Sequence, residues 1–324
     1  MKLPRRTFLH QAAGAAALPA MSRLAWALNY PTRPVKCIVA YPAGGPTDIF
    51  VRLVAQSLSE RFGQPFVVEN RAGAVSNIAT EAVARAAADG YMLLGTDAAA
   101  AINATLYPNL SFNFIRDIAV LGAIRAPLVM MVHPSVPARN VPEFIAYAKA
   151  NPGKINMGSA GNGNVSQLAG ELFNEMAHID MTDVPYRGGA PVITDLLGGQ
   201  VQVFFSSLVA TIDHVRAGRL RALAVTSSTR VALLPDVPTV SDFVPGYEMS
   251  QWYIIGVRKI TPAEIVDRLN KEINTVLADA KMEARFADLG ATVFPGSPAV
   301  LGGFVAAETE KFAKVIKAAN IKPE

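Results

Sequence analysis

Short apolar runs alternate with amphipathic stretches along most of the chain. The runs are rich in β-branched residues, which is typical of strands. Many of them show no polar alternation, as expected where helices cover both faces of a sheet. The predicted strands span residues 37–41, 66–69, 92–96, 119–124, 128–133, 155–159, 181–185, 201–206, 220–226 and 252–257.

Between these runs, apolar residues recur every three or four positions, as they do on one face of a helix. The regular alternation of strand and helix indicates an α/β architecture with mostly parallel sheets. The predicted helices span residues 47–61, 78–87, 141–150, 165–177, 190–197 and 212–217.

The pattern changes after Thr261, where two long amphipathic helices are predicted at residues 261–280 and 300–319. Thr261 and Glu264 enclose Pro262 as in a capping box with proline at the first helical position. The 324 residues suffice for two domains, and no linker separates them. We therefore expect an interleaved chain in which the C-terminal helices pack back onto the N-terminal domain.

The first 27 residues have a basic start, a short apolar run and an Ala-Trp-Ala site, the pattern of a secretory signal peptide. Arg5 and Arg6, followed by a weakly hydrophobic core, indicate the twin-arginine route. An ordinary amphipathic helix fits poorly, because glycine and proline interrupt the run and no acidic residue balances the arginines. We expect cleavage after Ala27 and a soluble protein in the periplasm.

Charge and cysteine content narrow the class of protein further. The first 27 residues hold four basic and no acidic side chains, and the remaining 26 Lys and Arg equal the 26 Asp and Glu. The net charge of +4 therefore lies in the signal segment, and nucleic-acid binding has little support. The single cysteine, Cys37, excludes a disulfide framework and a multi-cysteine zinc site, and its apolar strand suggests a small buried side chain.

Glycine-containing loops follow several predicted strands, and each opens a helix. The first loop runs from Tyr41 to Asp48 and has Gly44 and Gly45 between two prolines. Glycine lets the backbone approach a ligand closely, and the start of a helix attracts an anion. Thr47 or Asp48 could instead cap the helix, but capping does not explain the paired glycines.

A second loop, from Ser159 to Ser166, nearly matches a dinucleotide-binding fingerprint. Ser166 stands at the third glycine position, and no Gly-Lys-Ser/Thr follows, so the loop is not a P-loop either. Its N–H groups, hydroxyls and amides, including those of Asn162 and Asn164, form a small polar cradle. Such a cradle suits a carboxylate as well as a phosphate.

Other strand ends leave two interpretations open. Arg187, next to Tyr186, could pair with an anionic ligand or lie on the surface. Ser206 could contact a ligand or cap the next helix, and Asp97, after Thr96, is equally ambiguous. Ligands of open α/β sheets bind beyond the carboxyl ends of strands, so we expect these loops to converge.

The sequence contains few patterns that are typical of catalytic or metal-binding sites. The histidines beyond the signal segment, His133, His178 and His214, lack the spacing of metal ligands, and no Gly-x-Ser-x-Gly elbow occurs. Lysines and carboxylates are scattered over helical segments. We therefore expect no enzyme activity, no metal and no cofactor.

Taken together, these motifs resemble the Bug proteins, periplasmic solute-binding proteins associated with tripartite tricarboxylate transporters. The resemblance covers essentially the whole chain after the signal segment. It is carried by residues 30–34, 41–48, 68–74, 88–91, 161–163, 168–172, 184–188, 195–201, 218–226 and 234–240.

The resemblance implies a two-lobed, flytrap-like α/β fold of the periplasmic binding protein type, with two strand crossovers near residues 124–130 and 250–255. One lobe would comprise residues 28–126 and 253–324, and the other residues 127–252. The ligand would be a small carboxylate in the interlobe cleft, delivered to membrane subunits of the transporter. The expected ligand-binding residues are Tyr41, Gly44, Gly45, Thr47, Asp48, Thr96, Ser159, Asn162, Asn164, Ser166, Tyr186 and Ser206.

One departure from the family bears on the ligand. Many relatives have aspartate where this chain has Ser206, so one partner for a ligand ammonium group is missing, and we expect a carboxylate without an essential amine. Two other functions stay open: a sensory module that presents its closed form to a membrane receptor, and an exported α/β enzyme acting on a carboxylate or phosphate ester. Neither an activated nucleophile nor a metal cluster supports the enzyme.

Overall fold

The computed structural model describes residues 29–322 except 209 and 210, so the predicted signal segment lies outside the described residues. The described strands are β1 (Val35–Val39), β2 (Phe66–Asn70), β3 (Met92–Asp97), β4 (Ile118–Val132), β5 (Ile155–Ser159), β6 (Met181–Pro185), β7 (Val203–Ser207), β8 (Arg221–Val225), β9 (Ser250–Arg258) and β10 (Thr292–Phe294).

The described helices alternate with these strands and then dominate the C-terminal part. They are α2 (Pro46–Phe62), α3 (Asn77–Ala84), α4 (Ala99–Leu106), α5 (Phe114–Asp117), α6 (Val141–Ala150), α7 (Val165–Ala177), α8 (Gly189–Leu197), α9 (Ile212–Arg216), α10 (Ala263–Leu277), α11 (Ala280–Asp288) and α12 (Pro298–Ala318).

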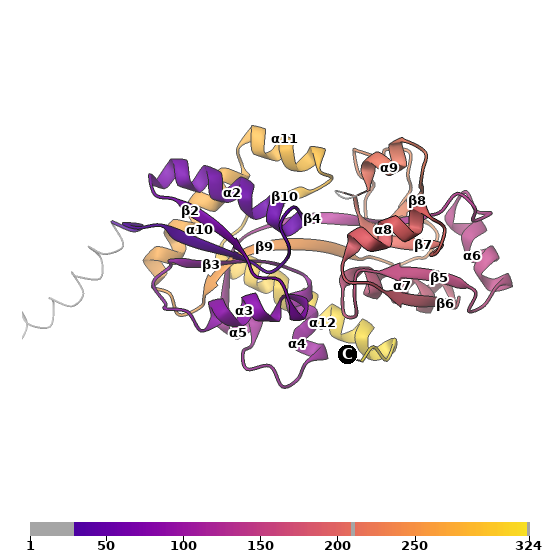
Figure 1. The fold of residues 1–324 in the computed structure, drawn as a ribbon, viewed down its shortest axis with the longest axis horizontal. Coiled ribbons are helices and arrows are strands. Elements are labelled where there is room, and N and C mark those ends of the chain that lie inside the picture. Colours follow the sequence, from indigo (N-terminus) through magenta and orange to yellow (C-terminus); the bar gives the residue numbers. More distant parts are fainter. Residues whose placement is uncertain (1–28, 209–210, 323–324) are drawn as a thin grey trace, which may run out of the picture.

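The strands form one mixed sheet in the order β2-β1-β3-β9-β4-β7-β5-β6, with β8 and β10 added against β4. Figure 1 shows two groups of elements along the long axis of the molecule, with β4 running from one group into the other. The first half of the sheet contains β1, β2, β3, β9 and β10, and the second contains β5, β6, β7 and β8.

One long strand, β4, replaces the two strands predicted at 119–124 and 128–133. Its residues through Pro127 pair with β9, and its residues from Leu128 pair with β7 and β8. Pro127 lacks an N–H, and it stands where β4 changes partners, so the strand continues through it. Nearly all of β4 is buried, which explains its unbroken apolar sequence.

Parallel pairing is confined to two groups of strands, so the prediction of mostly parallel sheets is wrong. The group β2-β1-β3 is parallel in the first half, and the group β6-β5-β7 is parallel in the second. Both groups meet antiparallel strands at the centre, because β4 and β9 run against their neighbours there. The central antiparallel pairing follows from a chain that passes into the second half and returns.

The C-terminal part contains more elements than the pattern indicated. The helix predicted at 261–280 ends at Leu277 as α10, and Asp279 caps a separate helix, α11. The predicted capping box is also wrong, because Pro262 is the N-cap of α10 and no side chain caps it. Sequence reasoning missed α4, α5 and β10: α4 is alanine-rich and buried on most sides, and the other two are short.

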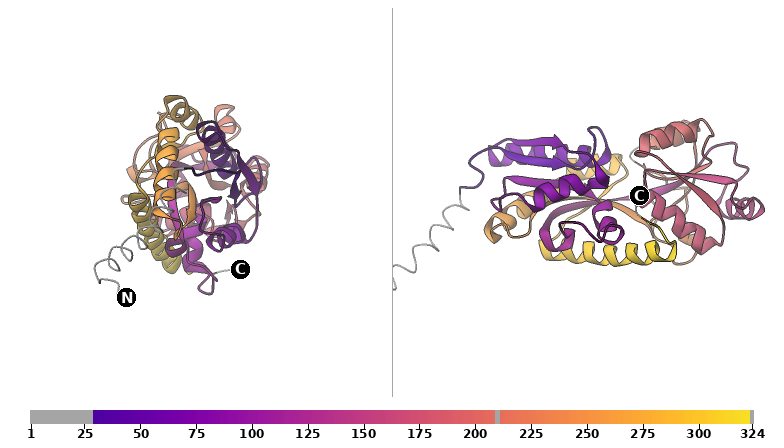
Figure 2. Two further views of the ribbon diagram at one scale, coloured as in Figure 1. Left: turned by 90° about the vertical axis from the view of Figure 1, so that its left-hand side faces the viewer. Right: turned by 60° about the horizontal axis from the view of Figure 1, so that its bottom comes forward.

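Side chains of β4 alternate between two faces of the core. On one face, a single apolar cluster includes Val120 in the first half and Met130 in the second. On the other face there are two clusters, one around Leu121 and one around Val129. The helix α12 packs against α4 and β4 and reaches α7 in the second half, as Figure 2 shows. Among the described helices, none has the length and apolar character needed to cross a membrane.

Candidate ligand-binding site

The carboxyl ends of the parallel strands in both halves point to the place where β4 changes partners. In the first half, β3 ends at Asp97 beside β9, and the first residue of β9 pairs with Pro127. In the second half, β7 ends at Ser207, which pairs with Leu128. Because β1 is parallel to β3 and β5 to β7, the loops after all four strands open towards this junction.

Asp48 fixes the loop after β1. Its carboxylate accepts hydrogen bonds from the main-chain N–H of Gly44 at 2.9 Å, from Arg52 at 2.8 Å and from Asn70 at 2.8 Å. Burial opposes the negative charge, but these donors hold the pKa of Asp48 below its ordinary value. Asn70 also donates to the carbonyl of Tyr41 at 2.9 Å. Both carboxylate oxygens of Asp48 are therefore used to hold the loop.

The first turn of α2 has no side-chain cap. Its N-cap residue is Gly45, so capping does not account for Thr47 or Asp48. Intrahelical bonding begins with the N–H of Ile49, which donates to the carbonyl of Gly45 at 2.9 Å. The N–H groups of Thr47 and Asp48 thus have no partner within the helix, and they lie at its positive end. This arrangement is suited to an anion.

In the second half, side chains fix the loop after β5. Asn164 caps α7 by accepting a bond from the N–H of Ser166 at 3.0 Å. The hydroxyl of Ser166 accepts a bond from the N–H of Ala160 at 2.9 Å and donates to the Asn164 amide oxygen at 3.0 Å. These two predicted ligand residues therefore determine the shape of the loop.

The middle of the same loop is held from α7. The N–H of Gly163 donates to the side-chain oxygen of Gln167 at 2.8 Å, and the Gln167 amide nitrogen donates to Asp183 at 2.7 Å. Asp183 lies on β6, where it pairs with Met157 of β5, two residues before Ser159, and Ser159 is fully buried. The loop is thus tied to two strands and a helix of the second half.

Two other predicted ligand side chains, those of Tyr186 and Ser206, also have partners within the protein. The hydroxyl of Tyr186 donates to Asp195 at 2.6 Å, and the hydroxyl of Ser206 makes a long contact of 3.4 Å with the carbonyl of Ser207. Arg187, the alternative anion partner, is exposed.

The loop after β5 also touches elements of the first half. Asn162 donates to the main-chain carbonyl of Lys322 at 2.7 Å, just beyond α12. Gly163, with φ at +73°, lies so close to α4 that an added Cβ would come within 2.4 Å of Leu106. This loop is therefore a contact between the two halves.

On the first-half side, a buried polar cluster forms around Asp97. The hydroxyl of Tyr41 and the N–H of Ala99 donate to one carboxylate oxygen at 2.5 Å and 3.0 Å. The amide nitrogen of Gln251 donates to the other oxygen at 2.9 Å. Burial raises the pKa of Asp97 to about 6, although these donors favour the charged form. The neighbouring Thr96 is fully buried.

Sequence reasoning missed three supporting residues, Asn70, Gln167 and Gln251. Asn70 directly follows the strand predicted at 66–69, and Gln167 follows the Asn164–Ser166 cap, so their positions are a usable signal for these two. Gln251 is 154 residues from Asp97, and the pairing of β3 with β9 brings them together. No spacing in the sequence reports that contact.

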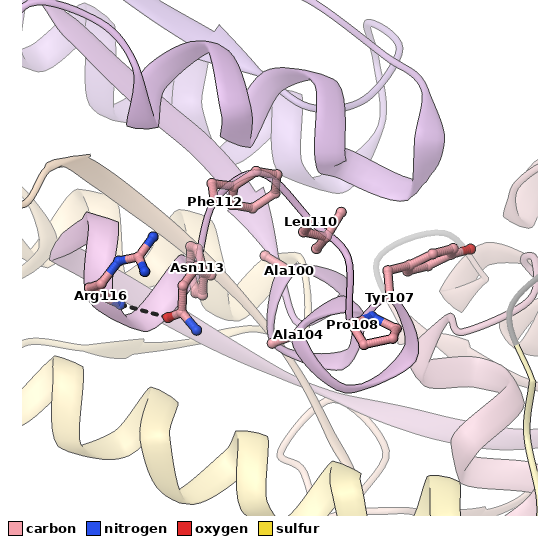
Figure 3. A pocket seen from close by; sticks show the side chains of 9 residues that line it. Ala100, Ala104, Tyr107, Pro108, Leu110, Phe112, Asn113 and Arg116 are labelled. Carbon is pink, nitrogen blue, oxygen red and sulfur yellow. Dashed lines mark hydrogen bonds between the residues drawn. The ribbon is translucent and has the colours of Figure 1, made fainter.

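Two cavities lie beside this region. The larger, about 200 Å³, is enclosed by α4 and the segment that leads into α5, and Figure 3 shows Tyr107, Phe112 and Arg116 around it. The smaller, about 10 Å³, lies between α2, α11 and the central strands. The predicted ligand residues line neither cavity. Within the described residues, no three His, Cys, Asp or Glu side chains are grouped to hold a metal ion.

Known proteins share both the sequence and the fold. A family model described as "Tripartite tricarboxylate transporter family receptor" matches residues 50–321. Protein BugT of Bordetella pertussis is 35% identical over 298 residues, which covers 91% of this chain and 91% of BugT.

Solved structures agree with this match. Rpa4515 of R. palustris with adipate has a TM-score of 0.85 and 36% identity, covering 91% of this chain and 100% of that one. MatC from Rhodopseudomonas palustris with bound malate has a TM-score of 0.80 and 29% identity, covering 89% and 100%. These likenesses confirm the expected two-lobed periplasmic binding protein fold. The chain therefore belongs to the tripartite tricarboxylate transporter receptor family, which includes the Bug proteins.

Proposed function

We propose that this protein captures a small organic acid by its carboxylate and delivers it to the membrane subunits of a tripartite tricarboxylate-type transporter. The uncapped start of α2 carries the proposal, because it offers anion-binding N–H groups where strand ends of both halves meet. The family consists of periplasmic substrate-binding receptors. Relatives solved with adipate and malate favour a dicarboxylate.

The carboxylate is held mainly by main-chain groups in this proposal. Asp48, Asn164 and Ser166 already bond within their own loops, which leaves the N–H groups of Thr47 and Asp48 as donors. Residues 1–27, outside the described structure, direct export by the twin-arginine route and are cleaved after Ala27. The periplasm is then where the ligand is captured.

We further assign residues 28–126 with the C-terminal helices to one lobe and the segment from residue 127 to the other. The change of partners at Pro127 supports the first crossing. The N–H of Met249 still bonds to Thr226 of the second half at 3.0 Å, whereas Ser250 pairs with Pro127. We therefore place the second crossing at Ser250, three residues before the boundary expected from the sequence. A ligand that contacts both lobes favours their closed arrangement.

The direct test is a binding screen on the chain that begins at residue 28. Thermal shift and calorimetry would use adipate, malate, succinate, citrate, benzoate, and aspartate as the amino form of succinate. We expect at least one dicarboxylate to raise the melting temperature, since a ligand that binds the folded state stabilises it. Succinate should bind at least as well as aspartate, because Ser206 offers no carboxylate to an ammonium group. Recovery of unchanged ligand by NMR distinguishes a receptor from an enzyme.

Two glycines of α2 provide a matched pair of variants. Gly44 precedes the helix with φ at +82°, Gly63 ends it with φ at +65°, and an added Cβ would meet nothing within 4 Å at either position. Gly44→Val and Gly63→Val should therefore cost similar stability, about 1–2 kcal/mol of backbone strain. Only Gly44→Val should weaken dicarboxylate binding, by about tenfold or more, which corresponds to 1.4 kcal/mol. Equal affinities would contradict the proposed site.

A further inference from the structure

We propose that Asp97 takes up a proton when a carboxylate ligand binds, so that ligand capture depends on pH through this side chain. The inference rests on the proposed function, because it requires an anion held by the loops beside Asp97. It goes further by assigning a role to a buried acid that makes no direct contact with the anion.

The position of Asp97 is unusual for an ionised carboxylate. The residue is only 4% exposed, at the end of β3, between the loop after β1 and the strand β9. Its hydrogen-bond partners, Tyr41, Ala99 and Gln251, are all neutral. A buried carboxylate without a cationic partner is costly to keep charged. Its raised pKa of about 6 shows that the charged form is only moderately preferred at neutral pH.

Most charged side chains on the elements around β3 have partners other than Asp97. Tyr41 and Tyr253 are the titratable side chains that interact electrostatically with Asp97. The helix α4, which follows β3, has no charged residue. On the other elements packed against β3, the charged side chains are Asp48 paired with Arg52, Glu81 paired with Arg85, Lys36 paired with Glu69, and Arg258, which donates to the carbonyl of Ala86. Near the far end of α2, Arg61 pairs with Glu272, and Glu60 is exposed.

A bound carboxylate changes the preference of Asp97 between its charged and its neutral form. It adds a negative charge at the loops that contain Tyr41 and the start of α2, and closure removes water from the same region. Both effects disfavour a second negative charge and raise the pKa of Asp97 further. Solvent supplies the proton, and the O–H bond on Asp97 is the only bond formed.

The three hydrogen-bond partners of Asp97 respond differently to the added proton. The main-chain N–H of Ala99 can only donate, and the side chain of Gln251 must rotate to accept. The hydroxyl of Tyr41 can reverse without moving its oxygen, since it donates and accepts equally well. Protonated Asp97 then donates to Tyr41, and the Tyr41 hydroxyl proton becomes free to donate to the ligand.

The test is a proton count during binding. Calorimetry with adipate, or with the tightest-binding acid of the panel above, is done at pH 7 in buffers of different ionisation enthalpy. We expect uptake of roughly 0.5–1 proton per bound ligand. Because the bound state holds more protons, the affinity should fall as pH rises from 6.5 to 8.5, by up to about tenfold per pH unit. Adipate is almost fully ionised over that range, whereas citrate still titrates at its lower end and is therefore left out of the proton count.

Variants identify the group that takes up the proton. The amide introduced by Asp97→Asn is neutral, as a protonated acid is. Its oxygen still accepts from Tyr41 and Ala99, and its NH2 group faces Gln251, whose side chain can rotate to accept. This variant should therefore bind within about threefold of the wild-type affinity at pH 6.5, with no proton uptake and a flat pH profile. Asp89→Asn, which removes an exposed partner of Arg33, should keep the uptake.

The possible outcomes separate this inference from the proposed function. Binding without proton uptake by the wild type, or uptake that persists in Asp97→Asn, would overturn the inference and leave the receptor function intact. Failure of every acid in the panel to bind would instead overturn the proposed function. If Asp97→Asn does not fold, an NMR titration of the Asp97 side-chain carboxyl signal in the wild type, with and without ligand, decides whether this group takes up the proton.

Discussion

Asp48 and Asn164 show what individual polar residues do in this protein. Each is expected from the sequence to contact a ligand, and in the structure each bonds to the main chain of its own loop, Asp48 to Gly44 and Asn164 to Ser166. A side chain that fixes a loop determines where the free N–H groups of that loop lie. Its importance can therefore be measured through stability, independently of any ligand.

Replacement of Asp48 by asparagine should lower the free energy of unfolding at pH 7 by about 1.5–3 kcal/mol, because bonds to a buried charged acceptor are lost. The folded-state pKa is depressed, so this contribution is complete above the ordinary pKa of 3.8 and disappears as pH falls through the lower folded value. Urea unfolding of both chains across this pH range measures the difference.

Asp89→Asn serves as the control for this measurement. Asp89 pairs with Arg33 at 3.0 Å, but the two side chains are 40% and 60% exposed. An exposed pair contributes about 0–1 kcal/mol, so the control should change stability little at any pH. A pH-independent loss in Asp48→Asn would contradict the role assigned to its charge.

At the scale of elements, helices and loops are packed too closely for side chains at several glycines. The start of α7 meets the end of α4 at Gly163, and the middle of α7 lies against β5 at Gly170, where an added Cβ would fall within 1.7 Å of the Met157 sulfur. The contact at Gly163 joins the two halves of the molecule. Its close packing therefore affects the arrangement of the two halves.

Gly163→Ala should lose about 1–2 kcal/mol from the left-handed backbone and a further 1–3 kcal/mol from the clash with Leu106. Gly218→Ala is the matched control, because its φ is +67° and an added Cβ would meet nothing within 4 Å. The additional Leu106→Ala substitution should recover part of the clash, so the double variant is more stable than the sum of single effects predicts. If urea unfolding shows that the losses in unfolding free energy are strictly additive, Gly163 and Leu106 are not in tight contact.

At the scale of the whole molecule, α12 belongs to the first half but reaches the second. It packs on α4 and β4, and the segment after it offers the carbonyl of Lys322 to Asn162. Ile321 packs against the core cluster that continues through both halves. This contact therefore complements the two chain crossings at β4 and β9.

A chain that ends at Ala319 should be less stable by about 1–3 kcal/mol, since it loses the apolar contact of Ile321 and the hydrogen bond from Asn162. Lys322→Ala keeps the main-chain carbonyl and should behave like the intact protein. Thermal and urea unfolding of the three chains provides the comparison. Equal stability of the shortened chain would rule out a stabilising role for this C-terminal contact.

The sequence by itself determined the local elements and the family. Strands at 155–159 and 181–185 and helices at 141–150 and 165–177 were predicted at their observed bounds, because periodicity and capping residues are local signals. The loops after β1 and β5 were also identified, since glycines between a strand and a helix are visible in the sequence.

Only the tertiary structure decided how those loops are held and where they meet. The fusion of two predicted strands into β4, and the contact between Asp97 and Gln251, depend on pairing between distant segments. Three predicted ligand side chains, those of Asp48, Asn164 and Ser166, accept hydrogen bonds from main-chain donors of their own loops. Local pattern specifies which residues can form hydrogen bonds, but long-range pairing decides which of them do. The physical reason is that most buried polar groups are paired, and their partners are whichever groups the fold places beside them.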